Sequence, residues 1–293
     1  MSAVPSTAPW LDEIRAAAQA AFVEADVPSD EDEVWRYSRI GDVDLSRYAL
    51  ASEVPGAPEP VLIEGAAATV TIRNGVAEIE RGDSLGTATV TLIAEHADGA
   101  SLLNSVRGDA IDAVGFLHDA NLGDVIVIDV PRGVVVEAPI VIDTYSGGAD
   151  SLTCPHTIVR AAAGSQVTVL ERRRSDDSDQ LVVPVVEMQA ANDANVGYLV
   201  IQQLGPATTS LEHLVSSVDQ QANVVSSVAA FGGSYARTRA DFKLIGRGAS
   251  GDLLSAYFGA GNQMLDFRTF QDCLLYTSPS PRDATLSRMP SSA

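Results

Sequence analysis

Cysteine and lysine are scarce in this sequence of 293 residues, which has two cysteines, Cys154 and Cys273, and a single lysine, Lys243. Two thiols are too few for a disulfide framework or for a four-thiolate metal site. Basic residues are also in the minority, because 19 lysines and arginines stand against 39 aspartates and glutamates, for a formal net charge of −20. This excess argues against nucleic acid and anionic membrane surfaces as partners, since both attract a basic protein face.

Long apolar runs are absent as well. No stretch of about 18 apolar residues occurs, so the sequence predicts no membrane-spanning helix. The first residues, Met1 to Pro5, lack the basic patch and apolar stretch of a secretory signal, and we therefore expect a cytoplasmic protein. With 46% hydrophobic and 20% charged residues, the composition is that of a globular chain.

The first 120 residues have a mixed helical and β pattern. Residues 10–25 have the apolar spacing of an amphipathic helix, and the acidic segment 28–33 indicates the start of a short second helix. Asn74-Gly75 lies between two alternating segments, which is the pattern of a β-hairpin. Residues 101–120 return to helical spacing. We expect residues 1–120 to form a small helical and α+β N-terminal region.

From Asp124 onward, short β-branched segments alternate with small polar turns at a spacing of roughly 26 to 30 residues, which is typical of stacked repeats. No helix of useful length lies between them, which disfavours a doubly wound α/β sheet. A sandwich stays open as an alternative, but a β-helix fits better, since each coil needs only short strands and small corners. The predicted strands include residues 125–128, 134–136, 140–142, 157–159, 167–169, 185–188, 198–201, 214–217, 224–228, 239–244 and 253–257, with turns at 162–165, 192–195, 219–222 and 246–249.

The segment Gly246–Gly251 matches the dinucleotide-binding pattern G-x-G-x-x-G. That motif requires a helix that begins at the glycines, so that the helix N-terminus can hold the pyrophosphate. Only residues 252–258 follow before the next glycines at 259 and 261. We therefore interpret the segment as a turn between two coils.

The densest run of charge is Glu171–Asp179. Carboxylates beside arginines on a β-helix would suit a calcium-dependent polysaccharide lyase, but the preferred interpretation is a solvated loop. Cys154 and His156 could form a metal-ligand pair or an activated nucleophile. A lone cysteine at a strand entrance is more often structural, and His96, His118 and His213 lack metal-ligand spacing.

Common catalytic patterns are missing, because the sequence has no G-x-S-x-G elbow, no Walker A loop and no H-E-x-x-H helix. We assign no catalytic and no metal-binding residue, and we leave cofactor-binding residues unassigned. The expected role is that of a binding or structural subunit rather than an enzyme.

Three segments resemble the SufB/SufD family, the scaffold proteins of the SUF iron–sulfur cluster assembly system. Residues 33–38, EVWRYS, are similar to the family's signature E-x-W-R-Y-[ST], and residues 128–140, IDVPRGVVVEAPI, to its segment V-P-[RK]-G-V-x-[VL]-E-x-P-[IL]. Residues 231–272 are similar to the later pattern L-G-G…R…G-x-x-A…G-x-[QH]-x-x-[DH]. The residues of the first two segments are closer to SufD than to SufB.

The resemblance implies a right-handed parallel β-helix core over residues 121–272 and a non-enzymatic scaffold role. It further implies pairing with a SufB-like paralogue and a SufC-like ATPase. No cofactor would be bound by this chain alone, and the iron–sulfur cluster would be handled transiently by the complex. A SufB-type paralogue scaffold and, less favoured, a β-helical carbohydrate-active enzyme are the alternatives.

The family pattern breaks after Asp272. Residues 273–293 are rich in serine, proline and threonine and resemble a translated sequencing adapter, so we expect a non-native tail behind an incomplete core. The region that docks the ATPase would then be largely missing, and Cys154 would be the remaining native thiol.

Overall fold

The computed structural model describes residues 8–50, 57–60 and 63–273. No helix in these ranges is long and apolar enough to cross a membrane. The expected non-native tail lies outside the described residues, apart from Cys273, which is the last residue of a strand.

The described N-terminal region contains three α-helices, α1 (Pro9–Glu24), α2 (Gly99–Leu102) and α3 (Ala113–Ala120). Helix α1 confirms the helix predicted over residues 10–25, whereas the single helix expected over 101–120 is divided into α2 and α3. Asp112 caps α3 because its Oδ1 atom accepts a hydrogen bond of 2.9 Å from the Gly115 N–H. The acidic segment 28–33 leads only into one turn of 3-10 helix, Glu33–Trp35.

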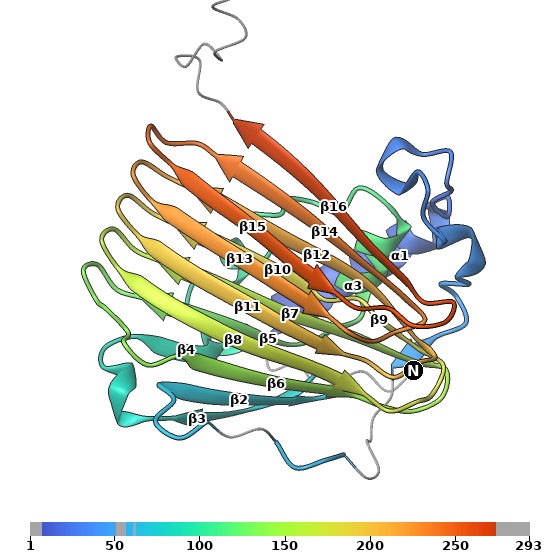
Figure 1. Ribbon diagram of the computed structural model, residues 1–293, viewed down its shortest axis with the longest axis horizontal. Helices are drawn as coiled ribbons and strands as arrows, with labels where there is room; N and C mark the ends of the chain where they lie inside the picture. Colours follow the sequence, from blue (N-terminus) through green and yellow to red (C-terminus); the bar gives the residue numbers. More distant parts are fainter. Residues whose placement is uncertain (1–7, 51–56, 61–62, 274–293) are drawn as a thin grey trace, which may run out of the picture.

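The remaining chain folds into two facing sheets that run the length of the molecule (Figure 1). Sheet A has the strand order β16-β14-β12-β10-β7-β5-β4, and sheet B has the order β15-β13-β11-β8-β6-β2-β3. From β5 onward the strands alternate between the sheets, apart from the short β9, so that two strands make one coil of a solenoid. The strand bounds are β1 (Ala49–Leu50), β2 (Ala68–Arg73), β3 (Val76–Arg81), β4 (Thr89–Leu92), β5 (Leu122–Val130), β6 (Ile140–Ser146), β7 (Ser151–Ala161), β8 (Gln166–Ser175), β9 (Gln180–Val182), β10 (Val185–Ala190), β11 (Asn195–Gln203), β12 (Thr208–Val218), β13 (Asn223–Ala230), β14 (Tyr235–Leu244), β15 (Ser250–Tyr257) and β16 (Met264–Cys273).

The coils stack in parallel and in register. In sheet B, for example, Gln166 pairs with Asn195, Asn195 with Asn223, and Asn223 with Ser250. Partners in successive coils are 29, 28 and 27 residues apart along this row, which confirms the repeat spacing predicted from the turns. The mainly β fold with a parallel solenoid of about five turns is thus confirmed. The right-handed sense of the coil stays a prediction from the family resemblance.

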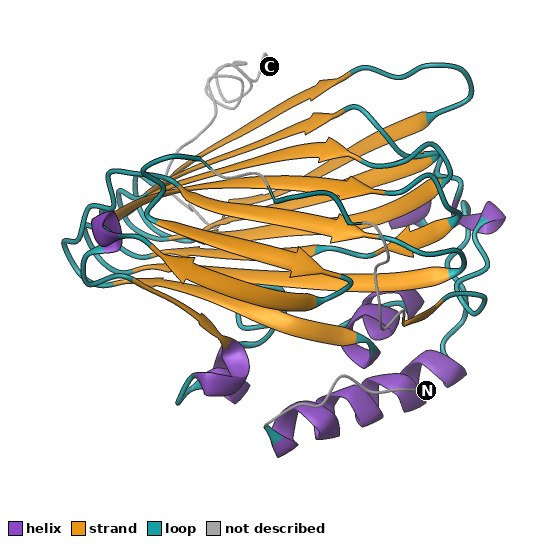
Figure 2. Ribbon diagram, turned by 90° about the horizontal axis from the view of Figure 1, so that it is seen from below, coloured by secondary structure: helices purple, strands orange, loops and turns teal. Residues whose placement is uncertain are grey.

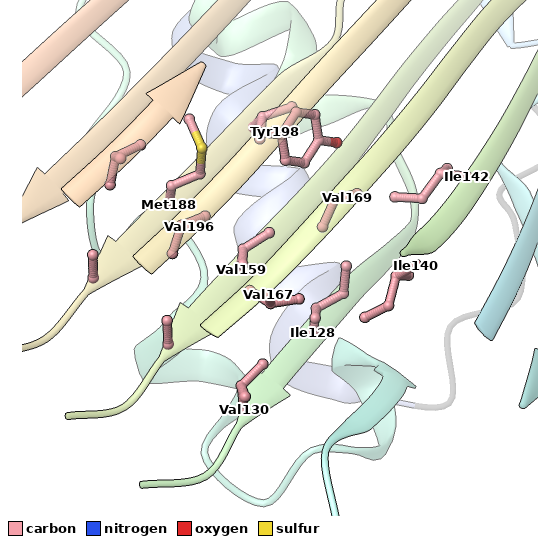
Figure 3. Close-up of a cluster of buried hydrophobic side chains, with 14 of the residues drawn as sticks. Ile128, Val130, Ile140, Ile142, Val159, Val167, Val169, Met188, Val196 and Tyr198 are labelled. Carbon is pink, nitrogen blue, oxygen red and sulfur yellow. The ribbon is translucent and has the colours of Figure 1, made fainter. Parts of the chain in front are cut away.

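The core lies between the two sheets, where every second side chain of each strand points inward (Figure 3). One level of it is the row Ile140, Val169 and Tyr198, which are register partners on β6, β8 and β11. All three are buried. Each buried aliphatic side chain contributes about 1.5–3 kcal/mol relative to exposure, so such rows are the main source of stability for the stack.

A second part of the interior contains buried charged side chains, and here the sequence prediction of a solvated loop over residues 171–179 is wrong for residues 171–175, whereas residues 176–179 do form a loop. Residues 171–175 of the acidic-basic run belong to β8, and Glu171 and Arg173 point between the sheets. Arg173 donates Nε and Nη2 to the two oxygens of Glu171, each at 2.7 Å, and Nη1 to Glu212 of β12. Two buried carboxylates are therefore held by one buried guanidinium. Tyr198 adds a hydrogen bond of 2.6 Å to Glu171.

The corners of the solenoid contain the small residues seen in the sequence. The segment Gly246–Ala249 is a turn that joins β14 to β15, and no helix follows it, so the interpretation against a dinucleotide site is confirmed. A Cβ atom at Gly246 would collide with the backbone of Gln220 in the preceding corner. The residue must therefore be glycine for the two corners to stack. The strand predicted over residues 134–136 is wrong, because it forms only an isolated bridge from Val135 to Gln166.

The N-terminal region adds strands to the first coil and covers part of the outer face of sheet A. The hairpin β2–β3 adds to sheet B with Asn74 and Gly75 at positive φ in its turn, which confirms the Asn-Gly prediction. Strand β4 adds antiparallel to β5 at the end of sheet A. Helix α1 lies along one side of the solenoid (Figure 2), and its Leu11 packs in a cluster with Val127 and Ile158 of sheet A.

Candidate functional site: a cavity between sheet A and helix α3

The outer face of sheet A carries charged side chains where it faces helix α3. Residues of β14 alternate in direction, so Arg237, Arg239 and Asp241 point outward while Thr238 and Ala240 face the core. The neighbouring strand β12 presents Leu211 and His213 on the same outer face. This alternation places several polar groups beside one another on the outer face of sheet A.

These side chains line a cavity of about 110 Å³. Its second wall is helix α3 with the preceding loop, which contributes Arg107, Asp109 and Val114 among others. Its third wall is the segment 33–40, here called the N-terminal strap, through Val34 and Trp35. The floor is apolar and includes Val183, Val185 and Leu211. The lining thus combines apolar surface with convergent charged groups, and a concave site of this kind can orient a small molecule.

One wall of the cavity is organised around the carboxylate of Asp241. Arg239 donates Nε to Oδ1 at 2.9 Å and Nη2 to Oδ2 at 2.7 Å, and His213 Nε2 lies 3.0 Å from Oδ2. Burial would raise the pKa of Asp241, but the hydrogen bonds from His213 and Arg239 lower it below its usual value. The Arg239 guanidinium also stacks over the Phe270 ring at 4.8 Å. Arg239 is therefore fixed in position.

The N-terminal strap is held against the last coils by arginines of sheet A. Arg237 stacks over the Trp35 ring at 4.6 Å, donates to the carbonyl of Val34 and pairs with Asp266 of β16. Trp35 in turn donates its indole N–H to Asp112 at 3.0 Å. The strap contains the EVWRYS segment noted in the sequence. Its contacts thus join residues more than 200 positions apart in the chain.

A chain of buried polar groups runs from the cavity wall beneath helix α3. His118 Nδ1 lies 2.7 Å from the carbonyl of Val183, His118 Nε2 lies 3.1 Å from His156 Nδ1, and His156 Nε2 lies 3.0 Å from Glu187 Oε1. Both imidazoles and the carboxylate are buried. Glu187 also accepts hydrogen bonds from the backbone N–H groups of Asn104, Val106 and Arg107. This network fastens the loop before α3 to strands β7 and β10.

The hydrogen-bond partners determine where the protons of this network lie. A carbonyl only accepts, so His118 carries its proton on Nδ1. Burial and the neighbouring His156 and Arg107 lower the pKa of His118 well below its usual value, so the ring is neutral and Nε2 accepts from His156. Burial would raise the pKa of Glu187, but the bond with His156 and the backbone donors lower it. His156 Nδ1 therefore faces the acceptor nitrogen of His118, and His156 Nε2 lies within hydrogen-bond distance of the Glu187 carboxylate.

The histidines and the cysteine that the sequence offered as candidate site residues lie in different surroundings. His118 and His213 are not isolated, as their sequence spacing suggested, because His118 contacts His156 and His213 Nε2 lies 3.0 Å from Asp241 Oδ2. Cys154 is buried two residues before His156 on β7, and burial together with Asp119 raises the pKa of its thiol well above the usual value. A thiol of this kind is a poor nucleophile, as expected for the structural role that the sequence favoured. His96 lies apart, 3.6 Å from Asp129.

The described ranges contain no group of three or more His, Cys, Asp or Glu side chains that could hold a metal ion. The cavity residues Arg237, Arg239 and Asp241 were not candidates from the sequence. The alternation of charged residues along β14 was the available signal, but only the fold shows which helix faces them.

The architecture defines the chain as a parallel β-solenoid whose outer face is partly covered by an N-terminal helical region. Residues 144–280 match the family model described as SUF system FeS cluster assembly, SufBD core domain. This match, which covers slightly less than half of the chain, supports the SufB/SufD family of SUF-system assembly proteins. It begins inside β6 and runs past Asp272, the residue at which the sequence pattern was expected to break. No curated protein matches the chain.

Proposed function

We propose that the protein is a SufD-like scaffold subunit of the SUF iron–sulfur cluster assembly machinery and has no enzymatic role of its own. The observation that carries this proposal is the SufBD core match, which coincides with the stacked coils from β6 to β16. The sequences of the strap and of residues 128–140 favour SufD over SufB. The iron–sulfur cluster is then a cargo that the assembled complex handles.

The alternative of a carbohydrate-active β-helix loses its main support from the placement of Glu171 and Arg173. A lyase would need carboxylates and a basic group to converge on an open groove. Here Glu171, Arg173 and Glu212 satisfy one another between the sheets, where a polysaccharide has no access. This favours a scaffold over an enzyme of that class.

The proposed partners are a SufB-like paralogue and a SufC-like ATPase. Coils of a parallel solenoid contact only their neighbours, so the stack is a stiff rod suited to transmitting movement between bound proteins. In this proposal the rod pairs with the paralogue and carries ATP-driven movements from the ATPase. The compartment is expected to be the cytoplasm.

The test is co-purification of the full gene product, tagged, with untagged SufB, SufD and SufC proteins from the same organism. We expect retention of SufB together with SufC, and no retention of SufD in the absence of SufB. Retention of SufD instead of SufB would identify a SufB-type paralogue. Failure to retain any of the three at equal expression would overturn the proposal. A tagged β-solenoid of unrelated family is the control for non-specific capture.

A further inference from the structure

The cavity beside helix α3 has more hydrogen-bond donors than its own carboxylates use. Arg239 directs Nε and Nη2 to Asp241, which leaves Nη1 without a partner among the described residues. Arg237 uses Nη1 and Nη2, and Arg107 uses Nε and Nη2, so each also retains an uncommitted nitrogen there. None of these nitrogens is among the buried atoms without a partner, so they remain open to solvent.

The acidic groups of the cavity are, by contrast, mostly engaged. Asp241 accepts three hydrogen bonds from Arg239 and His213. Asp112 accepts from the Trp35 indole and from the Gly115 N–H. Asp109 is the one lining aspartate with no hydrogen bond or ion pair among the described residues. The unused capacity of the cavity therefore lies in donors, and a ligand that accepts hydrogen bonds is favoured.

The floor restricts the ligand further. Val183, Val185 and Leu211 are apolar, Trp35 forms a side wall, and the volume is about 110 Å³. Planar guanidinium groups bind carboxylates through paired hydrogen bonds. We propose that this cavity is a binding site for a small organic acid, whose carboxylate contacts Arg237 and Arg239 and whose short apolar body lies on Leu211 and Val183.

Trp35 supplies a direct readout of binding. The chain has two tryptophans, Trp10 and Trp35, so the variant Trp10→Phe leaves Trp35 as the one source of indole fluorescence. Titration with butyrate is expected to change this fluorescence saturably, with a dissociation constant on the order of millimolar for so small a ligand. The uncharged isostere butyramide is expected to produce no saturable change. Inorganic phosphate is the probe for an anion site without an apolar requirement.

Three substitutions in the Trp10→Phe background test the arrangement. Arg239→Gln removes a charged donor and is expected to weaken butyrate binding about tenfold or more. Asp109→Asn removes the uncompensated negative charge and is expected to strengthen binding, an effect that misfolding cannot mimic. Arg172→Gln makes the same charge change on the outer face of sheet B, where Arg172 bonds Gln203, and is the matched control with unchanged affinity.

The outcomes separate the possibilities. Saturable binding of butyrate that responds to Arg239→Gln and Asp109→Asn as described supports the site. No saturable change with butyrate, equal binding of butyramide, tighter binding of phosphate than of butyrate, or an equal loss in Arg172→Gln would each overturn it. The result is independent of co-purification with SUF proteins.

Discussion

At the scale of single residues, the most unusual arrangement is the buried chain of His118, His156 and Glu187. Buried polar side chains are costly unless they are hydrogen-bonded, and these three lie within hydrogen-bond distance of one another, at 3.1 Å between the two imidazoles and 3.0 Å between His156 and Glu187. Each polar atom of the three side chains thus has a role in holding the loop before α3 onto the solenoid. The arrangement is stabilising only while His118 remains neutral.

This requirement predicts a specific dependence of stability on pH. The pKa of His118 is lowered in the folded state, so below its usual value of 6.5 the unfolded chain binds a proton that the folded chain does not. Stability should therefore fall as the pH decreases from about 7 to about 5, with a slope of up to about 1.4 kcal/mol per pH unit from this residue. Urea unfolding over this range measures it.

The variant His118→Gln should remove this contribution to the slope and lower the free energy of unfolding at neutral pH by about 1–3 kcal/mol, because the partners on both sides lose a hydrogen bond. His96→Gln, at a partly exposed histidine near Asp129, is the control and should retain the slope. An unchanged slope in His118→Gln would show that another group is responsible.

At the scale of the element, strand β8 shows how one strand serves two environments. Its inward residues pass from Val167 and Val169 to Glu171 and Arg173, while Arg172 between them points outward. Burial would lower the pKa of Arg173, but Glu171 and Glu212 raise it well above its usual value. The guanidinium therefore stays charged and links sheet B to sheet A through the core.

Removal of this charge should be far more harmful than removal of its neighbour. Arg173→Met leaves Glu171 and Glu212 buried without a cation, and we expect a loss of about 3–5 kcal/mol in the free energy of unfolding. Arg172→Met, one position along the same strand, should change stability by about 0.5 kcal/mol or less. Chemical unfolding of both variants measures the difference. Equal losses would mean that the charge pairs within the core contribute nothing specific.

At the scale of the whole molecule, the N-terminal strap links parts of the solenoid that are not neighbouring coils. Coils of a solenoid contact only their neighbours, so the end coils can open independently. The strap adds contacts from Trp35 to β14 through Arg237, and Arg268 of β16 donates to the carbonyl of Arg36 at 2.7 Å. The first and last parts of the described chain are thereby joined.

The variant Trp35→Leu should loosen the last coils selectively. It removes the stacking surface for Arg237 and the hydrogen bond to Asp112, and we expect faster amide hydrogen exchange in β14 and β16 than in β5 to β8. Trp10→Leu on helix α1 removes a comparable ring and is the control, with no preferential increase in those two strands. Uniform exchange changes along the solenoid in Trp35→Leu would contradict the role of the strap.

The elements of this fold could be predicted because their signals are local. The alternation within strands, the Asn-Gly turn and the repeat spacing all act over a few to about 30 residues, and each has a direct steric cause. Helix α1 was found for the same reason. The interpretation of residues 171–175 was wrong because a charged segment is normally solvated. No local signal distinguishes such a segment from a strand whose charged side chains pair with one another and with a distant residue inside the core.

The sequence by itself determined the class of this protein: stacked parallel coils, small corners and the segments that resemble the SufB/SufD family. Only the tertiary structure decided which polar residues meet. His118 and His156 come together because α3 packs on β7, and Glu212 reaches Arg173 because their strands lie on opposite sheets of the core. The strap meets Arg237 across 203 residues. Such contacts depend on coil register and on packing between distant segments, and local sequence patterns predict neither.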